Sequence, residues 1–375
     1  MNRLILIGNG FDLAHGLKTS YADFIEWYWE QWGKRLIKEI TDFLSDGLCS
    51  FKLHTTQYYS TWYHYWLQHR NPIIQWNFHE VAENSKQNER LCDFSYKSLF
   101  FEEICQSVEN RGWVDIENIY YSYLCKDDID PKLLNEQLAI IRTKLIEYLT
   151  EVQKNVTNNV IKGEIRSKMI APFCENDIAV GSKKEYGKMR ITSPNICPDR
   201  TLLLNFNYTD CADYYKHCLT IPSNVDIRKF DFHCPTIHIH GELPDESSVI
   251  FGYGDELDEK YKTIVSKNEN EYLRNVKSVK YLEHANYRNM LEFIESAPFQ
   301  IFIMGHSCGN SDRTLLNTLF EHRNCVSIKP FYYIKDDGSD NYIELVQNIS
   351  RNFTDMKLMR DRVVNKEFCE PLLNP

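Results

Sequence analysis

The organisation of this chain is decided by one stretch near its start, RLILIGNGFDLAHGL at residues 3–17. Four apolar residues in a row, 4–7, lead directly into Gly8-Asn9-Gly10 and then into a segment compatible with a helix. This order is typical of a buried parallel strand followed by a phosphate-facing turn. Glycines permit a close backbone approach, and N–H groups at the start of a helix favour an anion. Without a ligand, the same stretch is simply a tight strand-to-helix turn.

Composition limits the class of protein. The chain has 375 residues, of which 43% are hydrophobic and 26% charged, so a sizeable core is expected. The formal charge of −10 makes nucleic acid an unfavourable partner. No run approaches the ~20 apolar residues of a membrane span, and the start is too short for a secretory signal. Twelve scattered cysteines without a C-x-x-C motif indicate reduced thiols and a cytoplasmic location.

Helical periodicity dominates the region after the first turn. Thr19 and Ser20 are candidate N-caps, and Asp23 stands where the acid of a capping box would, at the start of an amphipathic helix that is expected to run to Phe43. A second long helix is expected from Asp130-Pro131 to Val160. No metal site is expected between them, because the spacings do not suit a metal-binding pair among the four histidines there, His54, His64, His69 and His79.

Short apolar runs characterise the second half of the chain, and each ends in Asn, His or Gly. Runs of this kind indicate a parallel sheet whose ligand site lies at the carboxyl edge of its strands. We therefore expect an α/β fold with a Rossmann-like parallel sheet and a large helical insertion. The expected strands after the first are 201–206, 236–241, 248–252, 299–304 and 328–334.

This pattern predicts three parts of the chain. The Rossmann-like nucleotide-binding core comprises residues 1–18 and 170–345. A helical, aromatic-rich insertion occupies 19–169, and a C-terminal segment occupies 346–375.

Polar side chains at the strand ends are candidates for chemistry. His240 ends one strand and suits a general base, because the unperturbed pKa of histidine is about 6.5. Asn207 follows another strand and can hold a hydroxyl or a water through its amide. Each also has a structural explanation, as a hydrogen-bonded strand end or a turn residue. His238 is expected to face away from His240, because successive residues of a strand alternate.

These motifs resemble two known groups of proteins. The opening stretch, followed by Ser20-Tyr21, is similar to the signature of the AbiH family of phage abortive-infection proteins, and that resemblance covers most of the chain. The segments NFNYT at 205–209, HIHG at 238–241 and GHS at 305–307 fit the same family. In order, these short motifs also resemble those of sirtuin-like NAD-consuming domains.

The resemblance implies a phage-defence effector that hydrolyses NAD, or a related nucleotide, at the nicotinamide–ribose bond. It implies that His240 is the base and that Asn207 orients the ribose or the attacking water. NAD is the expected substrate or ligand, with a phage-derived trigger or partner protein and a homo-oligomeric state. The nucleotide would contact Gly8, Asn9, Gly10, Phe11, Gly241, Gly305, His306, Ser307 and Asp312.

Two departures from the sirtuin-like pattern stand out. Asp12 occupies the position that usually holds a serine. An ionised carboxylate about 4 Å from a phosphate would cost roughly 4 kcal/mol at intermediate dielectric. Asp12 could instead bind ribose, hold a metal with the phosphate, or serve as a second acid or base, and we treat it as a catalytic candidate. The four-cysteine zinc site of protein-deacylating sirtuins is missing, so deacylation is not expected.

Three other functions remain open. A sensor would bind the nucleotide without turning it over. A metal-dependent nuclease would use Asp12 with further carboxylates to hold magnesium. A serine hydrolase would use Ser307 in GHSCG at 305–309, which matches G-x-S-x-G, but only His322 follows it.

Overall fold

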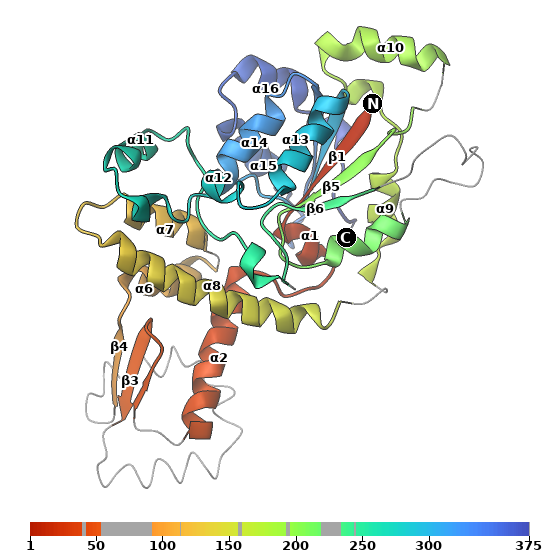
Figure 1. Ribbon diagram of the computed structural model, residues 1–375. Coiled ribbons are helices and arrows are strands. Elements are labelled where there is room, and N and C mark those ends of the chain that lie inside the picture. Colours follow the sequence, from red (N-terminus) through yellow and green to blue (C-terminus); the bar gives the residue numbers. More distant parts are fainter. Residues whose placement is uncertain are drawn as a thin grey trace. The chain divides into compact units, whose positions relative to one another are not determined.

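The computed structural model describes residues 1–39, 43–53, 92–112, 114–156, 160–192, 196–218, 234–243 and 245–374 (Figure 1). Two compact units are present: Met1–Thr19 with Leu149–Pro375, and Ser20–Tyr148. Residues 149–169, expected in the insertion, and residues 346–375 both fall in the first unit. The four histidines between 54 and 79 lie outside the described residues.

A parallel sheet is the centre of the first unit (Figure 1). Among the described residues it has five strands, in the order β6-β5-β1-β7-β8, and every neighbouring pair is parallel. The chain therefore builds the sheet outward from its first strand in both directions, which confirms the predicted Rossmann-like α/β fold. The strands are β1 (Asn2–Ile7), β5 (Thr201–Asn205), β6 (Thr236–His238), β7 (Phe299–Met304) and β8 (Cys325–Phe331).

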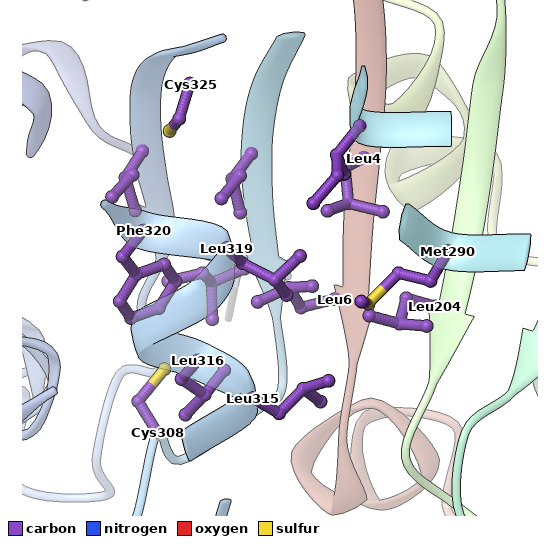
Figure 2. Packing of buried hydrophobic residues seen from close by; sticks show 14 of the residues in the cluster. Leu4, Leu6, Leu204, Met290, Cys308, Leu315, Leu316, Leu319, Phe320 and Cys325 are labelled. Atoms are coloured by element: carbon purple, nitrogen blue, oxygen red, sulfur yellow. The ribbon is translucent and has the colours of Figure 1, made fainter. Parts of the chain in front are cut away.

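Strand β1 is buried along its whole length because helices cover both faces of the sheet. Leu4 and Leu6 join a core cluster on one face, together with residues from four helices. Figure 2 shows part of this cluster, including Leu4, Leu6 and Met290. Ile5 and Ile7 join a second cluster on the other face. The first face carries α13 (Asn286–Ser296), α14 (Arg313–Phe320), α15 (Tyr342–Arg351) and α16 (Met356–Arg362), and the second carries α1 (Asn9–Ala14), α9 (Gly163–Met169) and the 3-10 helix η4 (Cys211–Cys218).

The prediction of a strand at 248–252 is wrong. Ile250 and Phe251 are buried, but their segment forms no strand and makes only an isolated bridge at Tyr253. Gly252 lies so close to another loop that a Cβ there would stand 1.9 Å from the Asn275 carbonyl oxygen. The apolar residues are thus buried by a loop packed on a loop. The remaining helices of this unit include α10 (Lys183–Thr192), α11 (Glu259–Ser266) and α12 (Lys277–Lys280).

The second unit is helical, with a small sheet that the sequence analysis did not predict. Within its described part, β2, β3 and β4 form an antiparallel sheet. The helix expected to reach Phe43 ends at Glu39, and Phe43 begins β2. The elements are α2 (Tyr21–Glu39), β2 (Phe43–Ser45), β3 (Cys49–Leu53), β4 (Cys92–Tyr96), α6 (Leu99–Arg111), α7 (Ile116–Leu124) and α8 (Pro131–Gln153), whose last turn continues into the first unit.

Local signals around α2 behave as expected. The Asp23 backbone N–H donates to Ser20 Oγ at 3.1 Å, and the Ser20 N–H donates to the Asp23 carboxylate at 3.2 Å, which confirms the capping box. Contacts between aromatic rings then join α2 to its neighbours in the unit: the buried Tyr28, Trp29, Trp32 and Phe101, and the half-buried Phe94 and Tyr96.

No helix in the described ranges combines the length and the apolar character needed to cross a bilayer. The ten cysteines whose side chains the structure describes form no disulfide with one another, and five of these ten are buried.

Candidate functional site

The turn after β1 packs directly against the turn after β7. A Cβ added to Gly8 would stand 2.5 Å from the His306 Cα, and one added to Gly10 would stand 2.9 Å from the Gly305 carbonyl oxygen. The Gly10 N–H donates to that same oxygen at 2.8 Å, and the Phe11 N–H donates to the Gly8 carbonyl at 2.8 Å. These glycines are therefore required by the contact between two loops. Their N–H groups are also occupied within the protein, so phosphate would need other donors here.

The end of β5 is tied to the first turn through Asn205 and Asn207. Asn205 is fully buried, and its side chain accepts from the Asn207 N–H at 3.0 Å and donates to the Thr209 carbonyl at 3.0 Å. The Asn207 Nδ2 donates to the Gly8 carbonyl at 3.0 Å. Asn207 is half-buried, and its Oδ1 accepts no hydrogen bond within the described ranges. An amide oxygen is thus left available beside the first turn.

Asp12 is buried beneath this turn. Its Oδ2 accepts from Thr209 Oγ1 at 2.5 Å, while its Oδ1 is buried without a hydrogen-bond partner in the described structure. Burial raises the pKa of Asp12 to about 7, although Thr209 and the Asn207 amide pull it the other way. Asp12 is therefore substantially protonated near neutral pH. Its neighbours include Asp210, whose charge also raises that pKa.

His240 belongs to a different group of charges. Its Nε2 lies 3.1 Å from Asp312 Oδ1, and the His306 Nε2 lies 3.5 Å from Asp312 Oδ2. The Lys277 Nζ donates to Asp312 Oδ1 at 2.8 Å. All four side chains are buried, and Lys277 is only 1% exposed. We call Lys277, Asp312, His240 and His306 the buried charge cluster.

The protonation states within the buried charge cluster follow from its geometry. Burial works against a charged Asp312, but Lys277 and the two histidines outweigh it and hold the pKa of that carboxyl well below its ordinary value. Burial lowers the pKa of His240, and Lys277 lowers it further, while Asp312 opposes them. An ionised Asp312 therefore lies beside a neutral His240.

Aromatic rings connect the buried charge cluster to the first turn. The Phe206 ring lies 5.3 Å from the His240 ring and 4.1 Å from the His306 ring. Tyr281 stacks on His240 with a centroid distance of 6.2 Å, and its hydroxyl lies 3.2 Å from Nε2. Since Phe206 precedes Asn207 and His306 adjoins Gly8, the ends of β1, β5 and β7 and the turn after β6 meet in one place.

The residues predicted as site members fall into three sets. Gly8, Gly10, Gly305 and Asn207 form the junction of turns, and His240, His306 and Asp312 form most of the buried charge cluster. Asp12 lies in a polar group with Thr209 and Asp210 that borders the junction of turns through the Asn207 amide, and His238 pairs with Asp213 at 2.8 Å instead of joining His240. Phe11 contributes its backbone N–H to the junction of turns, but its ring packs in the core. The others lie apart from these contacts: Asn9 accepts from Thr19 at 2.6 Å, the Ser307 side chain is exposed, and Gly241, at φ +85°, forms a turn against Ser248.

Sequence reasoning missed Lys277, Tyr281 and a second buried ion pair. Arg313 donates to Asp255 at 3.2 Å, and the Asp255 side chain is 3% exposed. The tight FGYGD segment at 251–255 could have signalled this region, because a Cβ at Gly254 would stand 3.0 Å from the Lys277 Cβ. No sequence pattern marked Lys277 as a member of the site, since its partner Asp312 is 35 residues away in the chain.

Within the part of the chain that the structure describes, no histidine is hydrogen-bonded to Ser307 of the G-x-S-x-G sequence at 305–309. The His306 Nδ1 accepts from the Cys308 N–H at 2.9 Å, and its Nε2 faces Asp312. The residue with the positive φ of +55° is Cys308, which is buried, and burial raises the pKa of its thiol. Among the described side chains, no group of three or more His, Cys, Asp or Glu is placed to hold a metal ion.

Comparison with known families gives one match over most of the chain. The model of the family described as "Bacteriophage abortive infection AbiH" matches residues 4–334. This range begins within β1 and ends just after β8. Comparison with curated proteins gives no match. The matched range contains the junction of turns and the whole buried charge cluster. The chain therefore belongs to the AbiH family, which indicates a role in abortive-infection defence against bacteriophage.

Proposed function

We propose that this protein is an abortive-infection effector that hydrolyses NAD, or a related nucleotide, at the bond between nicotinamide and ribose. The observation that carries the proposal is the meeting of four separate chain segments at the carboxyl edge of a Rossmann-like sheet. Asn207 reaches Gly8, and His240 and His306 share Asp312. Ligands of such sheets bind outside the carboxyl ends of the strands, where the strand order reverses. In this sheet that point lies between β1 and β7.

The proposed reaction needs positioned groups more than a strong nucleophile. The bond from ribose C1′ to the nicotinamide nitrogen breaks, and nicotinamide leaves with the electron pair. Water then adds to C1′ and gives up a proton, so that NAD and water yield nicotinamide, ADP-ribose and a proton. A site that orients the water and stabilises the developing positive charge on the ribose supplies most of what this step requires.

His240 suits the role of proton acceptor. A carboxylate can only accept hydrogen bonds, so the Nε2 that faces Asp312 carries the ring proton. The Nδ1 then has the lone pair, and within the described ranges no hydrogen bond occupies it. The lowered pKa keeps the ring neutral and able to take a proton from water. The open Oδ1 of Asn207 could orient that water or a ribose hydroxyl.

The partial protonation of Asp12 weakens an electrostatic objection to a nucleotide at this edge. A fully ionised carboxylate beneath the first turn would repel a diphosphate. With a pKa of about 7, Asp12 is about half neutral near pH 7, so it would repel a phosphate less than an ordinary aspartate. Asp12 is thus compatible with the proposed ligand.

The test is an assay with NAD, with and without extract from phage-infected cells, in which products are resolved by chromatography. Wild type and Asn207→Ala are compared, with Asn155→Ala, an exposed asparagine of the same unit, as the matched control. Nicotinamide and ADP-ribose should form with wild type and Asn155→Ala but not with Asn207→Ala. If NAD binds in calorimetry but stays intact, the protein is a nucleotide sensor and not an NAD-hydrolysing enzyme. The absence of both NAD binding and NAD turnover would overturn the proposal.

A further inference from the structure

The buried Lys277 is the least expected member of the site. Its side chain is 1% exposed, and its Nζ lies 2.8 Å from Asp312 Oδ1. A buried ion pair is usually no more stabilising than well-packed apolar residues of similar size. Stability alone therefore gives little reason for a lysine at this position.

The backbone holds Lys277 firmly in place. Its N–H donates to the Tyr253 carbonyl at 2.9 Å, and a Cβ on Gly254 would stand 3.0 Å from the Lys277 Cβ. The Gly254 N–H donates to the Ser311 carbonyl at 3.0 Å, one residue before Asp312. The loop at 253–254 thus lies between the lysine and its carboxylate partner and fixes both. This is a pre-organised arrangement, which suits a positioning role.

Several polar and charged groups from different segments of the chain surround His240. Asp312 lies 3.1 Å from its Nε2, the Tyr281 hydroxyl lies 3.2 Å from the same atom, and Lys277 and His306 both reach Asp312. Asp312 by itself would favour a doubly protonated His240, because opposite charges attract. A neighbouring ammonium counteracts this attraction. Lys277 also ensures that Asp312 is ionised and able only to accept, which fixes the tautomer of His240.

We propose that Lys277 is a positioning residue of the reaction: through Asp312 it holds His240 neutral, with its proton on Nε2 and its lone pair on Nδ1. This inference rests on the proposed function, because it explains how His240 becomes a base. Lys277 itself touches neither water nor nucleotide in this account. Its effect passes entirely through the protonation of a neighbour.

The test measures His240 directly by NMR titration of histidine-labelled protein, with its resonance assigned from His240→Ala. Lys277→Met removes the charge but keeps an unbranched side chain only one atom shorter, and Lys277→Arg keeps the charge. The control is Lys280→Met, on the same short helix, where Lys280 pairs with Glu283. We expect Lys277→Met to raise the proton affinity of His240 on the order of tenfold, and Lys280→Met to leave it unchanged. Lys277→Arg should remain close to wild type.

The pH profile of NAD hydrolysis provides the second measurement. Its acid limb should move to higher pH in Lys277→Met by the same amount as the titration, with activity recovering at alkaline pH. An unchanged His240 titration in folded Lys277→Met overturns the inference, and so does a shift of equal size in Lys277→Arg and Lys277→Met. If wild type does not cleave NAD, the proposed function is contradicted instead. The two failures can be told apart because the His240 titration does not require NAD.

Discussion

Gly305 and Phe11 stand so close that a Cβ at Gly305 would lie 2.0 Å from the Phe11 backbone nitrogen. The contact joins the turn after β7 to the turn after β1, the two central turns of the candidate site. Gly305 also has a φ of +79°, which side chains disfavour. Backbone clash and backbone conformation thus both exclude any residue other than glycine.

We expect Gly305→Ala to lower the free energy of unfolding by about 3 kcal/mol or more, because the loops must separate to accept a methyl group. The matched control is Gly338→Ala, at a φ of +82° with nothing within 4 Å of the added Cβ. That variant should lose only about 1 kcal/mol, from conformation alone. Urea unfolding measures both. Equal losses in the two variants would mean that the contact between the turns adds nothing.

Asp12 gives a pH dependence with a definite sign. Its pKa is raised to about 7 in the folded protein from an ordinary value of 3.8, so the folded state binds the proton more tightly than the unfolded state. The resulting stability is fully present below about pH 4 and is lost as the pH rises through about 7.

As the pH rises from 4 to 8, we therefore expect the free energy of unfolding of Asp12→Asn to increase relative to that of wild type, by on the order of 3 kcal/mol. The asparagine keeps an oxygen that can accept from Thr209. Free energies of unfolding at several pH values, in both proteins, provide the comparison. Parallel curves would show that Asp12 titrates normally.

Asp46 organises the second unit from a single loop. Its Oδ1 accepts from the N–H groups of Leu48 and Cys49 at 3.0 and 3.1 Å. Its Oδ2 accepts from the Tyr28 hydroxyl at 2.7 Å and from the Trp32 indole at 3.0 Å. One carboxylate thus links α2 to the turn between β2 and β3.

We expect Asp46→Ala to cost about 2–4 kcal/mol, because it leaves several donors unpaired, two of them on buried rings. Asp128→Ala, at an exposed aspartate of the same unit, should change stability by less than about 0.5 kcal/mol. Tryptophan fluorescence during urea unfolding reports on both variants. A similar midpoint for the two would contradict the role assigned to Asp46.

The central sheet was predictable because its strands are buried on both faces. An uninterrupted apolar run such as Leu4 to Ile7 has few other stable environments, and it became β1 with every residue buried. The run at 248–252 looked similar but packs as a loop against Asn275. The prediction that these apolar residues are buried was correct, but the prediction that their backbone forms a strand was wrong. The strands of the second unit are short, and β3 pairs with β4 across a long stretch of chain.

The candidate site was predictable only where residues follow strands. Asn207, His240 and His306 could be placed at one edge because parallel strands end together. Lys277 follows no strand of the sheet, and its partner is identifiable only after the loop at 253–254 has been placed. The raised pKa of Asp12 also depends on tertiary burial, which a sequence does not show. Whether these groups act on NAD stays a prediction.

The most direct test of the central claim is the loss of NAD cleavage when His240 alone is changed. Purified wild type, His240→Ala and His322→Ala are incubated with NAD and extract from phage-infected cells, and nicotinamide release is measured by chromatography. His322 is a histidine of the same unit that pairs with Glu295 and lies outside the site. The account expects His322→Ala to match wild type and His240→Ala to lose at least about a hundredfold in rate. Undiminished nicotinamide release by folded His240→Ala would contradict it.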